Sequence, residues 1–414
     1  MKFNILHSSI SPGLPFDIIV QIIDAVGENG DTNLLKELAL VSHCFHQICS
    51  KHLFATVELH DADPECDVAS SKKGFVKLLK IRPDVVKYIR KLTYEVGFAY
   101  DGHPRPPQRD DDLLSPILPN FLRTISRINC LKISASIRGW NEINPSLTSA
   151  FIHLMQLPTV NHIDLSNIRK FPMSSLIPSV NLLRLDLHNL DPLEEEIVVQ
   201  SEMMPKIREF HTLHSPRMTT KLLHAKRQDG QPAFNFMDLR RLSISLEDKR
   251  DVQYLMQNAK LLDKLHLEVY SQESLVGLLS PGARTLKILD LKVLIVEAYE
   301  EYFYHLFEGI CEELEALTGN NLLEALSFEI VVGVDCDETE DGIGSMIQNV
   351  EKVLVKPGWS TLRQVSFKVP VVHCLVDDSA VLSEALQSLP DKYVSHLSKL
   401  ESVVFNFSSY VVED

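Results

Sequence analysis

Apolar positions recur with two different periods along the chain. Between residues 11 and 59 they recur at spacings of three and four, which places them along one side of helices. Beyond about residue 88, short stretches alternate apolar with polar positions, as in strands that have one buried face. The pattern therefore predicts a small helical domain followed by a longer α/β region.

Three helices are predicted within the N-terminal segment. Pro15 suits the first turn of the first helix, because the N–H that proline lacks has no partner there. Polar and glycine residues at 27–33 end this helix, and Ser42 can cap the third one. A unit of about 45 residues is close to the lower size limit for an independent core. We therefore expect contacts with the rest of the chain or with a partner to stabilise it.

The region after residue 88 repeats one template, Leu-x-x-Leu-x-Leu, in which other aliphatic residues or Phe replace some leucines. Its middle positions are separated by steps of 22 to 39 residues, and helical patterns lie between many copies. The clearest copies begin at Leu182, Leu239, Leu262, Leu286 and Leu323. A short strand and a helix repeated about ten times predict an α/β solenoid, an arc with a parallel inner sheet and outer helices. A doubly wound α/β sheet also alternates strands with helices, but the shared template favours the solenoid.

The charge of the chain is concentrated in one segment. The net charge is −15, and residues 293–351 contain fifteen acidic residues and no Lys or Arg. This segment is either a surface for a basic partner or a solvated helix face with an acidic loop, and the second interpretation is favoured. A nucleic-acid-binding protein would show a basic stripe, so DNA or RNA is excluded as the main ligand.

Composition also bears on compartment. No apolar run approaches the ~18 residues of a membrane helix, so no membrane partner is expected. The seven cysteines include no Cys-x-x-Cys pair, which indicates reduced thiols in the cytoplasm, the nucleus or both.

No motif for catalysis or for a metal is complete. The cluster of His43, Cys44, His46 and Cys49 lacks the second ligand pair that a zinc site needs. Residues 337–342 resemble the start of a calcium loop, but its twelfth position is not the required glutamate. Phosphate-loop, nucleophile-elbow and zinc-protease motifs are absent. We therefore expect no catalytic residues, no metal and no cofactor.

The N-terminal motifs and the repeats together resemble the F-box/leucine-rich-repeat proteins. The residues that carry the resemblance are the run from Leu14 to Ile23, the run from Leu38 to Ser42, and Phe45, Ile48, Cys49, Leu53 and Phe54. The chain departs from the family at His43, where many members have Trp or Arg. It also has Ile168 and Leu190 where repeats often carry Asn. The resemblance implies an F-box-like domain at 11–59, a connecting helix and linker at 60–87, and an irregular leucine-rich-repeat solenoid at 88–414.

The resemblance also implies a function. Such a protein is the non-catalytic substrate receptor of an SCF-type cullin–RING E3 ubiquitin ligase. Its F-box binds the Skp adaptor, and through it a cullin, while its repeats bind a protein target. The residues expected to contact the adaptor are Leu14, Pro15, Ile18, Ile22, Leu35, Leu38, Phe45 and Ile48.

The positions between the buried leucines of each predicted strand face the hollow of the arc. They form the expected surface for the unidentified target, and in the middle repeats they include Arg184, Asp186, His188, Arg241, Ser243, Lys264, His266, Glu268, Asp290 and Lys292. Two alternatives stay open. The chain could be a leucine-rich-repeat scaffold whose N-terminal helices only cap the solenoid, or an α/β enzyme with an unrecognised motif.

Overall fold

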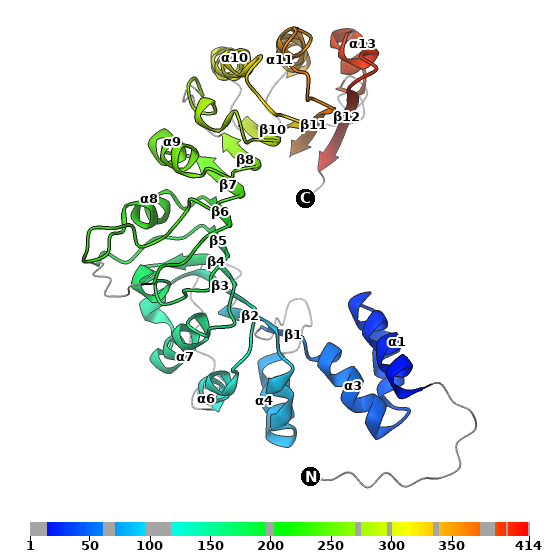
Figure 1. The fold of residues 1–414 in the computed structure, drawn as a ribbon, viewed down its shortest axis with the longest axis vertical. Coiled ribbons are helices and arrows are strands. Elements are labelled where there is room, and N and C mark those ends of the chain that lie inside the picture. Colours follow the sequence, from blue (N-terminus) through cyan, green and yellow to red (C-terminus); the bar gives the residue numbers. More distant parts are fainter. Residues whose placement is uncertain are drawn as a thin grey trace. The chain divides into compact units, whose positions relative to one another are not determined.

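Helices and parallel strands alternate along the chain in an α/β fold, seen in a computed structural model (Figure 1). The structure describes residues 15–60, 71–96, 117–195, 203–269, 275–295, 300–333, 339–372, 386–394 and 396–412. The chain divides into two compact units. The first unit comprises Met1–Ser136 and Ile143–Val160, and the second comprises Ile137–Glu142 and Asn161–Asp414.

The first unit begins with the three predicted helices, which are α1 (Phe16–Glu28), α2 (Thr32–Ala39) and α3 (His43–Leu53). Their apolar stripes meet in a small core around Ile23, Leu35 and Cys49. The Ser42 hydroxyl accepts a hydrogen bond from the Phe45 N–H at 3.2 Å, so the predicted cap of the third helix is confirmed.

The strands form one parallel sheet whose order follows the chain, as the repeated template predicts. The strands are β1 (Thr56–Leu59), β2 (Lys91–Val96), β3 (Cys130–Gly139), β4 (His162–Arg169), β5 (Arg184–His188), β6 (Glu209–Leu213), β7 (Arg241–Leu246), β8 (Lys264–Val269), β9 (Ile288–Ile295), β10 (Ala325–Gly333), β11 (Gln364–Val372) and β12 (Val404–Val412). The sheet of these strands is open, because β1 and β12 stand at opposite ends of the order. The sequence pattern did not predict β1, which pairs with β2.

The connections between strands are mostly helical. The α-helices after α3 are α4 (Ser71–Ile81), α6 (Ile117–Thr124), α7 (Pro145–Met155), α8 (Pro216–His224), α9 (Lys249–Asn258), α10 (Glu300–Leu317), α11 (Thr339–Leu354) and α13 (Leu389–Tyr393). The 3-10 helices are η1 (Pro83–Lys87), η2 (Trp140–Glu142), η3 (Met173–Ser175), η4 (Ser280–Gly282) and η5 (Leu397–Lys399). Within the second unit, α8, α9, α10 and α11 lie on the same side of the strands (Figure 1).

The leucines of the template fill the space between the sheet and these helices. Leu185 and Leu187 on β5 are fully buried, and the register places Leu185 beside Phe210 of β6. In β6 the next inward position is Thr212, where the template expects an aliphatic residue. Its hydroxyl lies 2.6 Å from the Thr219 hydroxyl on α8, so the buried oxygen keeps a hydrogen bond.

The residue that follows the paired stretch of the strand has the same backbone conformation in three consecutive repeats. Asn189 and His214 come directly after β5 and β6, and Asn167 lies at the equivalent position inside β4, after the stretch that pairs with β5. All three have positive φ, at 59° for Asn167, 51° for Asn189 and 53° for His214. Asn tolerates this left-handed region better than most residues. The Asn189 side-chain amide also donates a hydrogen bond to Asn167 Oδ1 at 2.9 Å, which joins two neighbouring repeats.

Two glutamates of the acidic segment at 293–351 are buried. Glu313 on α10 is 1% exposed and accepts hydrogen bonds from the backbone N–H groups of Leu279 and Ser280, at 2.6 and 3.2 Å. Glu351 on α11 likewise accepts hydrogen bonds from the backbone N–H groups of His396 and Leu397, which precede β12. These two residues therefore anchor loops to helices and are not part of a solvated face.

Among the helices of the described residues, none combines the length and the apolar character needed to pass through a lipid bilayer.

Candidate functional site

Five large apolar side chains at the N-terminal helices are exposed to solvent. We call them the exposed apolar set, and they are Phe16, Ile22, Leu34, Leu40 and Val41. Leu40 and Val41, which connect α2 to α3, are 87% and 65% exposed. The small core of the three helices forms from other residues, so these five side chains are not needed for its packing. Large exposed apolar side chains in a small unit of this kind make this surface a candidate binding site for another protein.

The residues predicted to contact an adaptor fall into three groups. Pro15 and Ile22 are exposed, whereas Ile18, Leu38, Phe45 and Ile48 are half-buried, the last three against the small core. Leu35 is only 2% exposed, so we assign it to the core and not to the surface. Leu14 lies outside the described residues. Phe16, Leu34, Leu40 and Val41 were not among the contact residues predicted from the sequence. The helical period marks which residues are apolar but not which of them the three helices leave exposed.

The second candidate surface is the sheet face that carries the polar positions of β4–β9. Strand register brings together all the residues predicted to bind a target, because alternate positions of paired strands lie side by side. We call this surface the polar face. It consists of His162, Asp164, Arg184, Asp186, His188, Glu209, His211, Arg241, Ser243, Ser245, Lys264, His266, Glu268, Asp290 and Lys292.

Asp186 is the centre of one cluster on the polar face. Arg184 Nη2 and His162 Nε2 each lie 2.9 Å from Asp186 Oδ2. Burial would raise the pKa of Asp186, but the hydrogen bonds from His162 and Arg184 outweigh it and lower the pKa to about 2. Arg184 also lies 3.5 Å from Glu209, whose other oxygen lies 3.3 Å from Arg241. The charges therefore alternate across four strands.

Glu268 is the centre of a second cluster. Lys292 Nζ lies 2.9 Å from Glu268 Oε1, and the Ser245 hydroxyl lies 3.5 Å from the other oxygen. Next to this cluster, Lys264 Nζ lies 3.0 Å from the Asp290 carboxylate. The carboxylates of Asp186 and Glu268 are almost fully buried, whereas the side chains of Arg184, Arg241 and Lys264 are 41–58% exposed. The buried Asp186 thus holds the exposed Arg184 in place, while Glu209 and Asp290, which are 27% and 26% exposed, hold Arg241 and Lys264.

His211 lies between the two clusters and was not among the residues predicted from the sequence. In the strand register it lies beside Asp186 of β5 on one side and Ser243 of β7 on the other. Its Nε2 atom is buried and has no hydrogen-bond partner among the described residues. Burial lowers the pKa of His211, although the charge of Asp186 opposes this effect. The alternation around Phe210 is the signal that could have found it.

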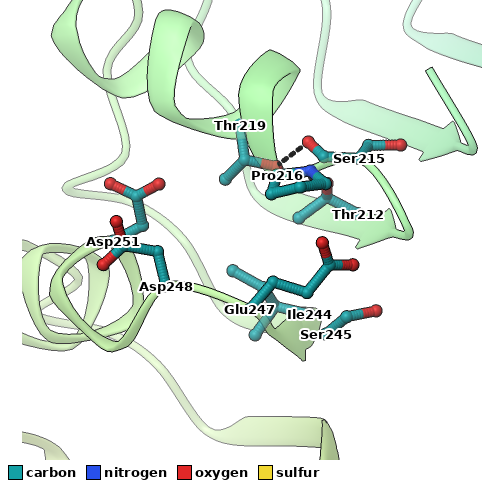
Figure 2. A pocket seen from close by; sticks show the side chains of 9 residues that line it. All are labelled: Thr212, Ser215, Pro216, Thr219, Ile244, Ser245, Glu247, Asp248 and Asp251. Atoms are coloured by element: carbon teal, nitrogen blue, oxygen red, sulfur yellow. Dashed lines mark hydrogen bonds between the residues drawn. The ribbon is translucent and has the colours of Figure 1, made fainter. Parts of the chain in front are cut away.

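A small cavity lies beside the ends of β6 and β7, where α8 and α9 begin (Figure 2). Its volume is about 10 Å³, which is room for one water molecule. Figure 2 shows the residues that line it, which are Thr212, Ser215, Pro216, Thr219, Ile244, Ser245, Glu247, Asp248 and Asp251. Burial raises the pKa of Glu247 and of Asp251. A cavity of this size has no room for a substrate molecule.

Metal-binding chemistry finds no support in the part of the chain that the structure describes. There, no three His, Cys, Asp or Glu side chains come together in a group that could hold an ion. In the N-terminal His/Cys cluster, Cys49 is buried in the small core, and Arg82 Nη1 lies 2.8 Å from His46 Nε2.

No protein-family model matches this chain, and no curated protein matches its sequence. The function of the chain is therefore inferred from its own residues and their geometry.

Proposed function

We propose that this protein is the substrate receptor of an SCF-type cullin–RING E3 ubiquitin ligase and that it catalyses no reaction itself. In this proposal the three N-terminal helices act as an F-box that binds the Skp adaptor, and through it a cullin. The polar face binds a protein target. The receptor would act by raising the local concentration of target lysines near the ubiquitin-charged enzyme.

The observation that carries the proposal is the exposed apolar set next to a core that is already closed. Burying one aliphatic side chain completely is worth about 1.5–3 kcal/mol, so several such residues can drive a stable interface. A helical unit that served only as a cap would turn its large apolar side chains toward the chain that it covers. Leu40 and Val41 instead have most of their surface in solvent.

The proposal also includes the type of fold of the second unit. We propose that the second unit is an irregular leucine-rich-repeat solenoid. The strand register supports it, because equivalent template positions pair with one another from Leu185 through Phe210 and Leu242 to Leu265. The shared left-handed conformation of Asn167 and Asn189 supports it as well.

The polar face supports the target-binding part of the proposal. Exposed bases held by buried and half-buried carboxylates suit the recognition of a polar protein surface. Free thiols at Cys44, Cys49, Cys130 and Cys311 fit the proposed location in the cytoplasm, the nucleus or both. Proteins that accumulate when the chain is deleted from its source cell would be candidate targets.

Binding of the purified Skp adaptor to the complete chain of residues 1–414 tests the proposal. Calorimetry should give a dissociation constant below about 10 µM, and Ile22→Asp with Leu40→Asp should weaken binding by at least about 30-fold. Leu261→Asp is the matched control, because Leu261 in the second unit has the same 48% exposure as Ile22. Thermal unfolding of each variant shows that the fold is intact. If the unaltered chain does not bind the adaptor, the proposal is wrong and the alternative of a leucine-rich-repeat scaffold is favoured.

A further inference from the structure

β12 is the last strand of the sheet and pairs, among the described residues, only with β11 (Figure 1). The pairing is continuous from Gln364 opposite Val404 to Val372 opposite Val412, without a bulge. A nine-residue strand is about 30 Å long. The second unit therefore ends in a long and regular strand edge.

The backbone of β12 presents hydrogen-bonding groups at this edge. The Val404 N–H donates to the Arg363 carbonyl at 2.7 Å, so Val404 faces β11. In a parallel pair, alternate residues face the same neighbour. It follows that Phe405, Phe407, Ser409 and Val411 direct their N–H and C=O groups to the open side. These groups are a ready template for another strand.

The side chains of β12 contain none of the features that usually protect an edge strand. Its sequence, VFNFSSYVV, has no charged residue and no proline. Val404 is 62% exposed and Tyr410 is 48% exposed. Phe407 is only half-buried, whereas Phe328 of β10 and Phe367 of β11, at the equivalent positions, are fully buried. Phe405, which pairs with the fully buried Val365, is also only half-buried. The row of aromatic side chains in the sheet thus remains partly uncovered at its end.

We propose that β12 pairs antiparallel with β12 of a second copy of this chain, about a two-fold axis at Ser408. In this register Phe407 faces the partner copy's Ser409 and Phe405 faces its Val411. All four are residues whose backbone groups point outward, and they would form roughly eight hydrogen bonds across the interface. The inner-face phenylalanines of each copy would then be flanked by β12 of the second copy, where the sheet otherwise ends.

The absence of charge is what favours a second copy over another protein. An uncharged strand offers a foreign partner no electrostatic complementarity, but it allows two identical strands to meet without repulsion. Antiparallel pairing about a two-fold axis also closes after two copies, whereas parallel stacking of copies would continue without limit. This inference does not depend on the proposed function, because adaptor binding involves α1, α2 and α3 and the dimer involves β12.

Sedimentation equilibrium of the complete chain between about 1 and 100 µM tests the proposal. A dimer is expected for the unaltered chain. Ser408→Lys puts two like charges opposite each other on the axis and next to Lys368 of each copy. It should weaken the dimer by at least about tenfold. Ser408→Gln, which is uncharged, should leave the dimer intact.

Mixing Ser408→Lys with Ser408→Glu should restore association as a mixed dimer, since opposite charges then meet on the axis. If Ser408→Lys fails to fold, Ser409→Pro replaces it, because the Ser409 N–H faces outward and its loss spares the bonds to β11. A monomer at all concentrations overturns the proposal. So does a dimer that neither the Lys variant nor the Pro variant weakens, because another surface would then hold the two copies together.

Discussion

The ammonium group of Lys292 on β9 lies 2.9 Å from the carboxylate of Glu268 on β8, which is almost completely buried. A buried charge that loses its partner is costly, and the imidazole of His266, 3.9 Å from Glu268 Oε1, is too distant to replace the hydrogen bond from Lys292. We therefore expect Lys292→Met to lower the free energy of unfolding by about 3 kcal/mol. Urea unfolding followed by circular dichroism measures this change.

Lys287→Met is the control for the Lys292 variant. Lys287 pairs with Glu324 at 3.1 Å, but both side chains are 53% exposed. Ion pairs in solvent contribute less than about 1 kcal/mol, so this variant should be close to the unaltered chain. Equal losses for the two lysines would mean that burial of Glu268 does not control the stability of the polar face.

Asp186 should make the stability of the second unit depend on pH. Its pKa of about 2 in the folded chain lies below the usual value of 3.8, so the folded state favours the ionised form. The stabilisation is complete above about pH 4 and is lost as the pH falls through about 2, and it amounts to about 2 kcal/mol. Asp186→Asn should therefore be less stable than the unaltered chain at pH 6, and the difference should shrink toward pH 2. A difference that stays constant with pH would contradict this assignment.

His211 should make stability depend on pH at higher pH values than Asp186 does, near neutral pH. Burial lowers its pKa below the usual 6.5, so protonation favours the unfolded chain. Asp186 and Glu209 oppose this shift, whereas Arg184 and His188 strengthen it. The stability that His211 contributes is full above about pH 6.5 and falls as the pH is lowered from there. His211→Gln should flatten the loss of stability between about pH 6.5 and pH 5, which urea unfolding at a series of pH values measures.

The sequence could predict the strands because each copy of the template has a local period of two. The template also matches the run from Leu400 to Phe405, with Val403 as its middle position, but the register pairs Val365 of β11 with Phe405, two residues later. The local pattern fits both choices. Packing against the neighbouring strand decides between them, and that packing involves residues about 40 positions away in the chain.

For the polar face, too, the local sequence pattern predicted which residues share a face, but not the contacts between residues that are distant in the chain. Alternation within a strand places Asp186 and Glu268 on the polar face, and this was predicted. It does not show that both carboxylates are buried under basic side chains, because Lys292 reaches Glu268 from the next strand. Fifteen acids without a base in one segment likewise suggested only surface charge, and burial of Glu313 depends on a loop more than thirty residues earlier.

Glu313 should stabilise the second unit by holding a loop against α10. Its carboxylate accepts hydrogen bonds from the backbone N–H groups of Leu279 and Ser280 and so fixes the connection between β8 and β9 to α10. Glu313→Ala leaves these donors without a partner, and each lost hydrogen bond to a charged group is worth about 1.5–3 kcal/mol. We expect a loss of at least about 2 kcal/mol in urea unfolding. Glu312→Ala, at an exposed position of the same helix, is the control and should change stability by less than about 0.5 kcal/mol. Hydrogen exchange of the Leu279 amide should accelerate in the first variant only, since its hydrogen bond goes to Glu313 and not to Glu312. If the two variants lose stability equally, α10 as a whole, and not the buried carboxylate, holds this connection.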